Sequence, residues 1–278
     1  IVRYETIADQ IMNRRETWTG FSEGATRFLI GFLKKVLLAN NFALLADKAF
    51  SMPADEISFS FAWFGAICYT LQIYYDFSGY SDMAIGLGRL FGFRFPENFN
   101  YPYISRSTSE FWRRWHISLG SWFRDYVYFP IGGSRVNSRK RIVFNLLVVW
   151  FLTGLWHGAN WTFILWGLLY FVSISVEKLT GFEGLKIGNH PFLSVVMKHL
   201  YTMLLVIFGW VLFRSENLSY AAQYLSAMLG LSPGSAASGA AGVYALENWV
   251  FLAAGICFSM PVAPALRRWF TRNRRDPV

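Results

Sequence analysis

The strongest constraint on this chain is a series of apolar blocks whose length suits a lipid bilayer. About 20 apolar residues in a helix span the hydrocarbon layer of a membrane. Only 15% of the 278 residues are charged and 54% are hydrophobic, whereas an ordinary soluble domain has roughly 25% charged residues. The sequence therefore predicts an all-α polytopic membrane protein with one membrane-embedded domain, 1–278. The predicted apolar segments are 28–46, 57–75, 142–156, 160–176, 193–213 and 245–260.

The distribution of arginine and lysine predicts how the chain is oriented in the bilayer. The formal net charge is +9, and cytoplasmic loops are enriched in basic residues that also meet anionic lipid heads. We place 76–141 and the basic tail 267–275 in the cytoplasm, which requires 142–156 and 160–176 to form a hairpin. The stretch 214–244 then lies outside. In so apolar a chain the positive charge favours lipid contact over nucleic-acid binding.

The cysteines and histidines give no sign of a disulfide or a metal site. Cys68 and Cys257 each lie within an apolar block, which is typical of buried small side chains rather than of a disulfide or a metal pair. The histidines show no recognised metal-ligand spacing, so we expect no metal site. The chain begins at Ile1 without the pattern of a signal peptide, so we expect a fragment of a longer protein.

An amphipathic helix is predicted over 109–129. Ser107 and Glu110 have the spacing of a capping box, and the helix would end before Pro130 after about 30 Å. Opposed apolar and charged faces suit a helix that lies on the membrane surface. The predicted apolar face consists of Phe111, Trp115, Leu119, Trp122 and Tyr126, and the polar face includes Arg113, Arg114, Ser118, Ser121, Arg124 and Asp125.

The stretch 76–94 is rich in glycine, serine and aspartate and follows an apolar segment. It predicts a short helix over 82–92, whose glycines would permit close approach of another helix. A carboxylate at this depth is costly and often functional, so Asp76 is a candidate substrate-binding residue. A structural ion pair with Arg89 or Arg94 is an equally good interpretation of its position.

His157 is the leading candidate for chemistry because it lies between two apolar arms, after Trp156 and before Gly158. Burial disfavours the charged imidazole and would keep it neutral, ready to accept a proton. Its position fits equally well a histidine that joins two helices through a hydrogen bond.

His116 and the arginines beside it are weaker candidates. The position of His116, at the boundary of the amphipathic helix, favours an anchor at the membrane interface. Arg113, Arg114 and Arg124 form a cationic face that could bind the phosphates of a carrier such as coenzyme A. Attraction to lipid head groups explains the same face and is the commoner role.

Two stretches resemble the signature sequences of the membrane-bound O-acyltransferases. They are 74–135, which contains EFWRRWHISLGSW, and 152–167, LTGLWHGANWTFILWG. PIGGSR at 130–135 and LTGLWHGANW at 152–161 resemble the bacterial branch that O-acetylates alginate and similar exopolysaccharides. The resemblance implies a ring of transmembrane helices around a funnel or tunnel, with interfacial and re-entrant helices, in the bacterial inner membrane. Relatives usually carry further spans at both ends, which agrees with a fragment.

The resemblance also implies an activity and assigns residues to it. His157 matches the essential histidine of the family and His116 matches its second histidine. A cytoplasmic thioester, expected to be acetyl-coenzyme A, would donate an acetyl group that crosses the membrane. Neutral His157 would take the proton of the attacking hydroxyl, Trp156 and Asn160 would position the ring or the acyl group, and His116, Arg113 and Arg114 would shape the donor's path.

The acceptor implied by the resemblance is a periplasmic partner acetyltransferase, which would complete the transfer to the polysaccharide. No bound cofactor is expected. Two alternatives remain open. The same fold could transfer D-alanine or another acyl group to a cell-wall polymer, or the chain could be a transporter or scaffold without chemistry, since broken helices around a midplane ionisable residue are typical of transporters.

Overall fold

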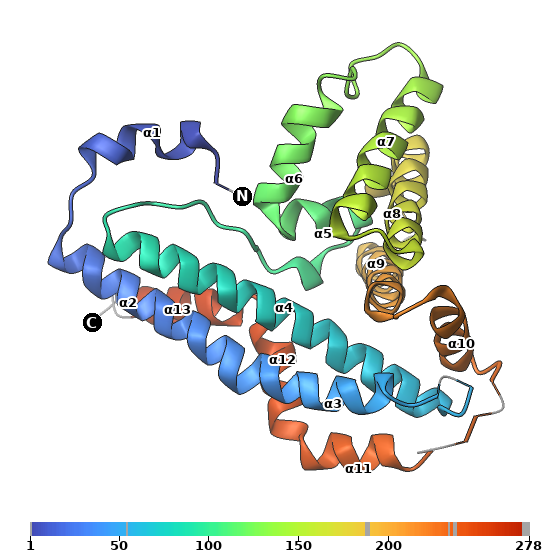
Figure 1. The fold of residues 1–278 in the computed structure, drawn as a ribbon. Helices are drawn as coiled ribbons and strands as arrows, with labels where there is room; N and C mark the ends of the chain where they lie inside the picture. The colour runs from blue at the N-terminus through green and yellow to red at the C-terminus, as the bar shows by residue number, and fades with distance from the viewer. Residues whose placement is uncertain (1, 54, 187–189, 233, 236–237, 274–278) are drawn as a thin grey trace.

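The computed structural model describes residues 2–53, 55–186, 190–232, 234–235 and 238–273, without the side chains at 267, 270, 272 and 273. These residues form helices joined by loops, with no β-strand among them (Figure 1). The prediction of an all-α chain is confirmed for this part of the protein.

A long helical rod runs from Trp18 to Phe50 and packs along α4 (Phe59–Leu90) (Figure 1). The rod consists of α2 (Trp18–Leu33), a π-helical turn (Lys34–Ala39) and α3 (Asn40–Phe50). Glycines let the backbones approach, since a Cβ on Gly24 would lie 2.7 Å from the Gly86 carbonyl oxygen. The close helix contact predicted from the glycines of 76–94 is confirmed.

The prediction that 82–92 forms a separate short helix is wrong, because α4 continues unbroken through this stretch over about 48 Å. Its acidic side chains meet the basic side chains of the rod. Asp82 accepts hydrogen bonds from Arg27 Nη2 (2.5 Å) and Lys34 Nζ (2.6 Å), and Asp76 pairs with Lys35. These ion pairs neutralise the aspartates of the stretch 76–94 within the packed pair of helices.

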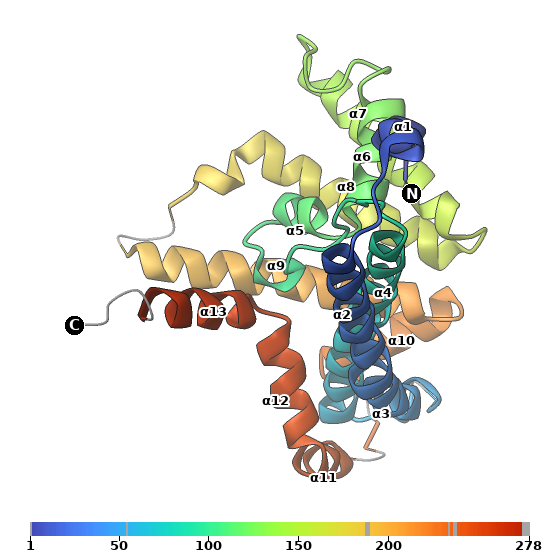
Figure 2. The same ribbon diagram turned by 90° about the vertical axis from the view of Figure 1, so that its left-hand side faces the viewer.

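Helices α7 (Arg139–His157) and α8 (Trp161–Thr180) form a hairpin (Figure 2), as the distribution of basic residues predicted. The turn follows from local chemistry. Gly158 has φ 152°, and the Asn160 side chain accepts a hydrogen bond from Thr162 N–H at the start of α8. The turn places His157 at the point where the hairpin reverses.

The predicted helix over 109–129 is wrong as a single element. The structure has α5 (Thr108–Arg114), α6 (Ile117–Phe123) and a π-helical turn (Arg124–Tyr128), with a break at Trp115 and His116. Apolar residues keep the helical period across the break, so periodicity could not reveal it. Half of the predicted capping box is confirmed, since Ser107 Oγ accepts a hydrogen bond from Glu110 N–H (2.9 Å). The other half differs, because Glu110 Oε2 accepts from Arg106 N–H (2.9 Å) instead of Ser107 N–H.

The remaining apolar helices partly match the predicted segments. The rod 18–50, α8 and α9 (Pro191–Arg214) are long and apolar enough to cross a membrane. The predicted segment 245–260 is instead divided at Asn248 by a bend of 73° between α11 (Ala240–Glu247) and α12 (Trp249–Phe258). The basic tail lies partly outside the described residues. The other helices are α1 (Tyr4–Asn13), α10 (Leu218–Met228) and α13 (Val262–Asn273).

Candidate active site

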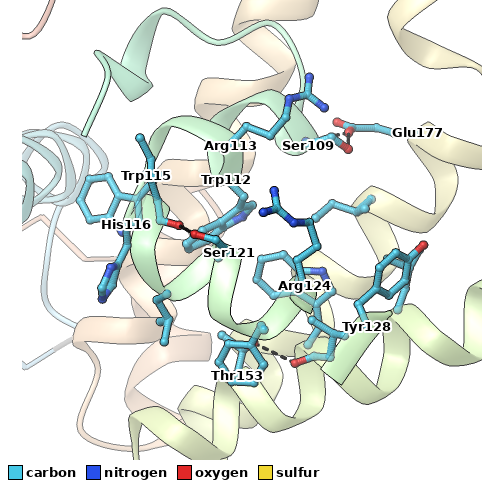
Figure 3. A pocket seen from close by; sticks show the side chains of 18 of the residues that line it. Ser109, Trp112, Arg113, Trp115, His116, Ser121, Arg124, Tyr128, Thr153 and Glu177 are labelled. Atoms are coloured by element: carbon cyan, nitrogen blue, oxygen red, sulfur yellow. Dashed lines mark hydrogen bonds between the residues drawn. The ribbon is translucent and has the colours of Figure 1, made fainter. Parts of the chain in front are cut away.

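A cavity of about 950 Å³ lies among α5, α6, α7, α8 and α9, at the upper end of the volumes that bind small molecules and cofactors. Both histidines singled out from the sequence, His116 and His157, line it. Aromatic rings of Trp112, Trp166 and Phe213 form much of its wall. Figure 3 shows the labelled side chains of α5 and α6 along this wall.

His157, the last residue of α7, sits among aromatic rings. Its imidazole centroid lies 4.9 Å from Trp156, 5.0 Å from Trp166 and 5.0 Å from Phe213, all in edge-to-face contact. No hydrogen bond joins this imidazole to any residue that the structure describes, and neither ring nitrogen is sealed from solvent. The ring is therefore fixed by packing, and both of its nitrogens remain available to a ligand.

His116 is held differently. Its backbone is left-handed (φ 46°, ψ 54°), which is uncommon for a residue with a side chain. Its Nδ1 lies 3.2 Å from Asn98 Oδ1, and its ring meets Phe77 edge-to-face at 4.7 Å. His116 lies outside the candidate spans, and burial lowers its pKa to about 4. The imidazole is therefore neutral at neutral pH.

The other end of the cavity is polar. Arg113, Arg124 and Lys178 line it together with Glu177 and Glu183. Lys178 lies 12 residues beyond Trp166 on α8, which corresponds to about 18 Å along the helix. In Figure 3 the Arg113 and Arg124 side chains lie on the Glu177 side of the cavity, away from His116. The cavity therefore joins a cationic end to an end that carries the histidines.

Ion pairs and hydrogen bonds hold this polar end in place. Arg113 Nη2 donates to Glu183 Oε1 (2.8 Å), and this bond lowers the pKa of the Glu183 carboxyl. Lys178 Nζ donates to the hydroxyl of Tyr128 (2.9 Å). Both basic side chains are solvent-exposed, so they can exchange these partners for an anionic ligand.

Glu177 is a buried carboxylate, only 3% exposed. It accepts hydrogen bonds from Thr108 N–H (2.5 Å), Ser109 N–H (2.9 Å) and Ser109 Oγ (2.7 Å). These groups lie at the N-terminus of α5, whose first N–H groups have no partner within the helix. Glu177 therefore ties α5 to α8 across the polar end of the cavity.

The structure brings some of the predicted site residues together. Arg113 lines the cavity with both histidines. The Trp156 ring is 54% exposed and lies near both histidine rings, 4.9 Å from His157 and 6.4 Å from His116. Trp156 itself is outside the cavity lining. It would therefore affect a ligand indirectly, by holding the two histidine rings in place.

Three other predicted residues lie elsewhere and have local partners. Asn160 starts α8 and donates from Nδ2 to the Glu216 carbonyl (2.9 Å). Arg114 binds Glu110 and the Asn100 carbonyl. Asp76 pairs with Lys35 on the rod rather than with Arg89 or Arg94. None of the three lines the cavity.

Several site residues were missed in the sequence. Glu177 and Lys178 directly follow the predicted apolar arm 160–176, and a carboxylate at the end of such an arm is a usable signal. Asn98 contacts His116 from a loop whose sequence shows no local signal. Among the described residues no group of three metal-ligating side chains gathers into a possible metal site.

Comparison with known proteins agrees with the family resemblance of the sequence. The model of the membrane-bound O-acyltransferase family matches residues 1–184. The chain is 49% identical over 228 residues to the probable alginate O-acetylase AlgI of Pseudomonas syringae pv. tomato, covering 82% of this chain and 42% of that protein. It is 39% identical over 236 residues to the peptidoglycan O-acetyltransferase of Helicobacter pylori, covering 84% of this chain and 44% of that protein.

A more distant relative carries another activity in its name. The teichoic acid D-alanyltransferase of Bacillus subtilis is 32% identical over 158 residues, covering 54% of this chain and 39% of that protein. The chain thus spans less than half the length of each of these relatives.

Proposed function

This chain belongs to the membrane-bound O-acyltransferase family of multi-pass membrane proteins, and from that premise we propose that it carries the active site of a polysaccharide O-acetyltransferase. The acetyl group would come from a cytoplasmic thioester and would be used to O-acetylate an alginate-like exopolysaccharide. The proposed location is the bacterial inner membrane.

One observation carries this proposal: one cavity has both histidines at one end and three basic side chains, beside two glutamates, at the other. A thioester of a phosphorylated carrier has the matching shape, because its phosphates and its acyl group are joined by a long flexible arm. Arg113, Arg124 and Lys178 offer donors to the phosphates. The acyl group would then reach the rings around His157.

The proposed reaction assigns the proton transfer to His157. A ring nitrogen of His157 accepts the proton of the attacking hydroxyl while the hydroxyl oxygen bonds to the thioester carbonyl carbon. The tetrahedral intermediate then expels the thiolate, which takes a proton and leaves as the free thiol. General base catalysis of this kind contributes roughly 10²–10⁴-fold, and holding both reactants in one cavity contributes further.

The donor and the acceptor are proposed from the same geometry. Acetyl-coenzyme A, with phosphates at one end and an acyl thioester at the other, matches a cavity with basic side chains at one end and aromatic rings at the other. The acceptor hydroxyl would approach His157 from the side of the turn between α7 and α8, and would belong to a periplasmic acetyltransferase that passes the acetyl group to the polymer. The names of the relatives that act on alginate and peptidoglycan support a polysaccharide acceptor.

D-alanyl transfer is a second candidate because a D-alanyltransferase matches about half of the chain. A transfer assay with membranes that contain the complete protein should distinguish the two donors. Labelled acetyl-coenzyme A should deliver its label to the polysaccharide fraction, and an excess of the D-alanyl thioester should not reduce this transfer. Delivery of D-alanine in place of acetate would overturn the proposed donor. Absence of transfer from either donor would favour a scaffold or transporter.

A further inference from the structure

The neighbourhood of His116 determines which of its ring nitrogens carries the proton. Asn98 Oδ1 lies 3.1 Å from Ser118 N and 3.2 Å from His116 Nδ1. A backbone N–H can only donate, so the Asn98 atom that faces it must be the amide oxygen rather than the amide nitrogen. An amide oxygen can only accept, so a hydrogen bond between it and His116 Nδ1 requires the proton to be on Nδ1. Ser118 Oγ lies 3.5 Å from the same nitrogen but 3.0 Å from Asn98 Oδ1, so the shorter contact takes the hydroxyl proton to Asn98.

The protonation state of Nε2 of His116 follows from that of Nδ1. A neutral imidazole has one protonated nitrogen, so Nε2 carries the lone pair. Burial keeps the ring neutral by lowering its pKa to about 4. Nε2 has no hydrogen-bond partner among the described residues, and it is not sealed from solvent. It is therefore free to accept a hydrogen bond from a ligand in the cavity that His116 lines.

Asn98 also shapes the backbone that carries His116. Its carbonyl oxygen accepts from Ile117 N–H (3.0 Å), and its side-chain oxygen accepts from Ser118 Oγ (3.0 Å) as well as from Ser118 N–H. Two residues further on, Asn100 N–H donates to the Arg114 carbonyl (2.9 Å). The loop thus bonds to both sides of the break between α5 and α6, where His116 has its left-handed backbone.

We infer that Asn98 is a positioning residue that fixes His116 as the Nδ1–H tautomer and so presents Nε2 to the cavity as a hydrogen-bond acceptor. The tautomer is inferred from the structure alone, and only the role of Nε2 in binding an acyl donor rests on the proposed function. With an acyl donor bound, Nε2 can accept a hydrogen bond from an amide N–H group of the thioester arm. The opposite tautomer would present an N–H to the same group and repel it.

The tautomer can be read directly from ¹⁵N magnetic resonance of histidine-labelled complete protein in membranes at neutral pH. The signals of His116 are those that disappear in His116→Asn. We expect Nδ1 to give a protonated-type signal and Nε2 an unprotonated-type signal in the wild type. The reverse pattern in the wild type would overturn the inference.

Three variants separate positioning from simple support of the loop. Asn98→Asp keeps an oxygen acceptor and should keep the tautomer, with turnover within about threefold of wild type. Asn98→Leu should give a mixture of tautomers and lower turnover by about tenfold. This loss is smaller than the roughly 10²–10⁴-fold loss expected when an acid–base group itself is removed. Asn100→Ala is the matched control, since the Asn100 side chain is exposed and only its backbone bonds to Arg114.

The result that contradicts the inference is an Asn98→Leu protein with an unchanged tautomer and unchanged turnover. If Asn98→Leu fails to accumulate in membranes, the wild type and Asn98→Asp still decide the assignment through their spectra. The spectra are recorded without substrate. A wild type that has the expected tautomer but transfers no acetyl group would therefore support the assignment of Asn98 while overturning the proposed function.

Discussion

At the scale of single residues, the two cavity histidines are held in different ways. His157 is fixed by edge-to-face packing of aromatic rings and has no hydrogen bond among the described residues. His116 is fixed by a hydrogen bond from Nδ1 and by a left-handed backbone. A ring free at both nitrogens suits a base that must accept and later release a proton. A ring with one nitrogen engaged suits a binding group.

This difference leads to a prediction for His116→Asn. Asparagine tolerates the left-handed backbone and keeps a side-chain N–H for the Asn98 oxygen, but it has no atom at the place of Nε2. We expect the donor concentration at half-maximal rate to rise by about tenfold, with less than about a threefold change for the acceptor. Initial rates in membranes, measured over a range of each substrate, check this expectation.

An equal change for donor and acceptor would contradict a donor-binding role of His116. Asn100→Ala serves here too as the control in the neighbouring loop, because its exposed side chain lies outside the cavity lining.

Sequence could indicate His157 because an imidazole between two apolar arms is rare enough to be informative. It could not indicate Asn98. The contact between Asn98 and His116 depends on the loop folding back over a helix break, and the contacting residues are 18 positions apart. Sequence also could not show the partners of Asp76 and Asn160, since the Lys35 side chain and the Glu216 carbonyl are brought to them only by the folded chain.

At the scale of elements, α5 and α6 are two short helices that depend on other elements for their placement. Each has 7 residues, and isolated helices of this length are unstable in water. Glu177 of α8 binds the N-terminus of α5, and the loop around Asn98 binds the break that follows. The geometry of the cavity thus rests on contacts made from outside these helices.

Glu177→Ala should destabilise the protein by about 2 kcal/mol, because buried N–H donors at the start of α5 lose their acceptor. It should also weaken donor binding, since Arg113 follows on α5. Glu177→Gln keeps one oxygen acceptor and should fall between the wild type and the alanine variant. Denaturant unfolding of the purified protein in detergent gives the difference in unfolding free energy.

Glu183→Ala provides the comparison for Glu177. The Glu183 side chain is 57% exposed, and an exposed ion pair contributes roughly 0–1 kcal/mol. An equal loss of stability in both variants would show that the buried carboxylate does not anchor α5 in the way described.

Element types followed well from sequence, whereas element boundaries did not. The α7–α8 hairpin was predictable because apolar arms flank a turn and the basic residues require a return to the cytoplasm. The break at His116 was hidden because Phe111, Trp115 and Leu119 keep a helical period through it and are all buried. The continuity of α4 could not be predicted from local sequence, because the lysines that neutralise its aspartates lie on the rod, far away along the chain.

At the scale of the whole molecule, transfer of an acetyl group across the membrane requires the two ends of the cavity to face opposite sides of the bilayer. The cationic end belongs with the basic stretch before α7, and the turn after His157 contacts the segment that leads into α10 through Asn160 and Glu216. A cytoplasmic donor and an external acceptor could then reach the same histidine from opposite directions.

Cysteine labelling tests this orientation. Lys140 and Ser219 are exposed and lie near opposite ends of the hairpin. In a background with the exposed Cys257 replaced by alanine, Ser219→Cys should react with an impermeant maleimide in spheroplasts. Lys140→Cys should react only after the membrane is permeabilised. The reverse pattern of labelling would contradict the proposed direction of acetyl transfer.

The O-acetyl content of the secreted polysaccharide shows whether His157 carries the chemistry. A deletion strain would be complemented with the complete gene as wild type, His157→Ala or His190→Ala, at matched membrane levels. His190 is an exposed histidine outside the cavity lining. We expect wild type and His190→Ala to restore acetylation and His157→Ala to restore none. Full acetylation with His157→Ala would contradict its role as the base.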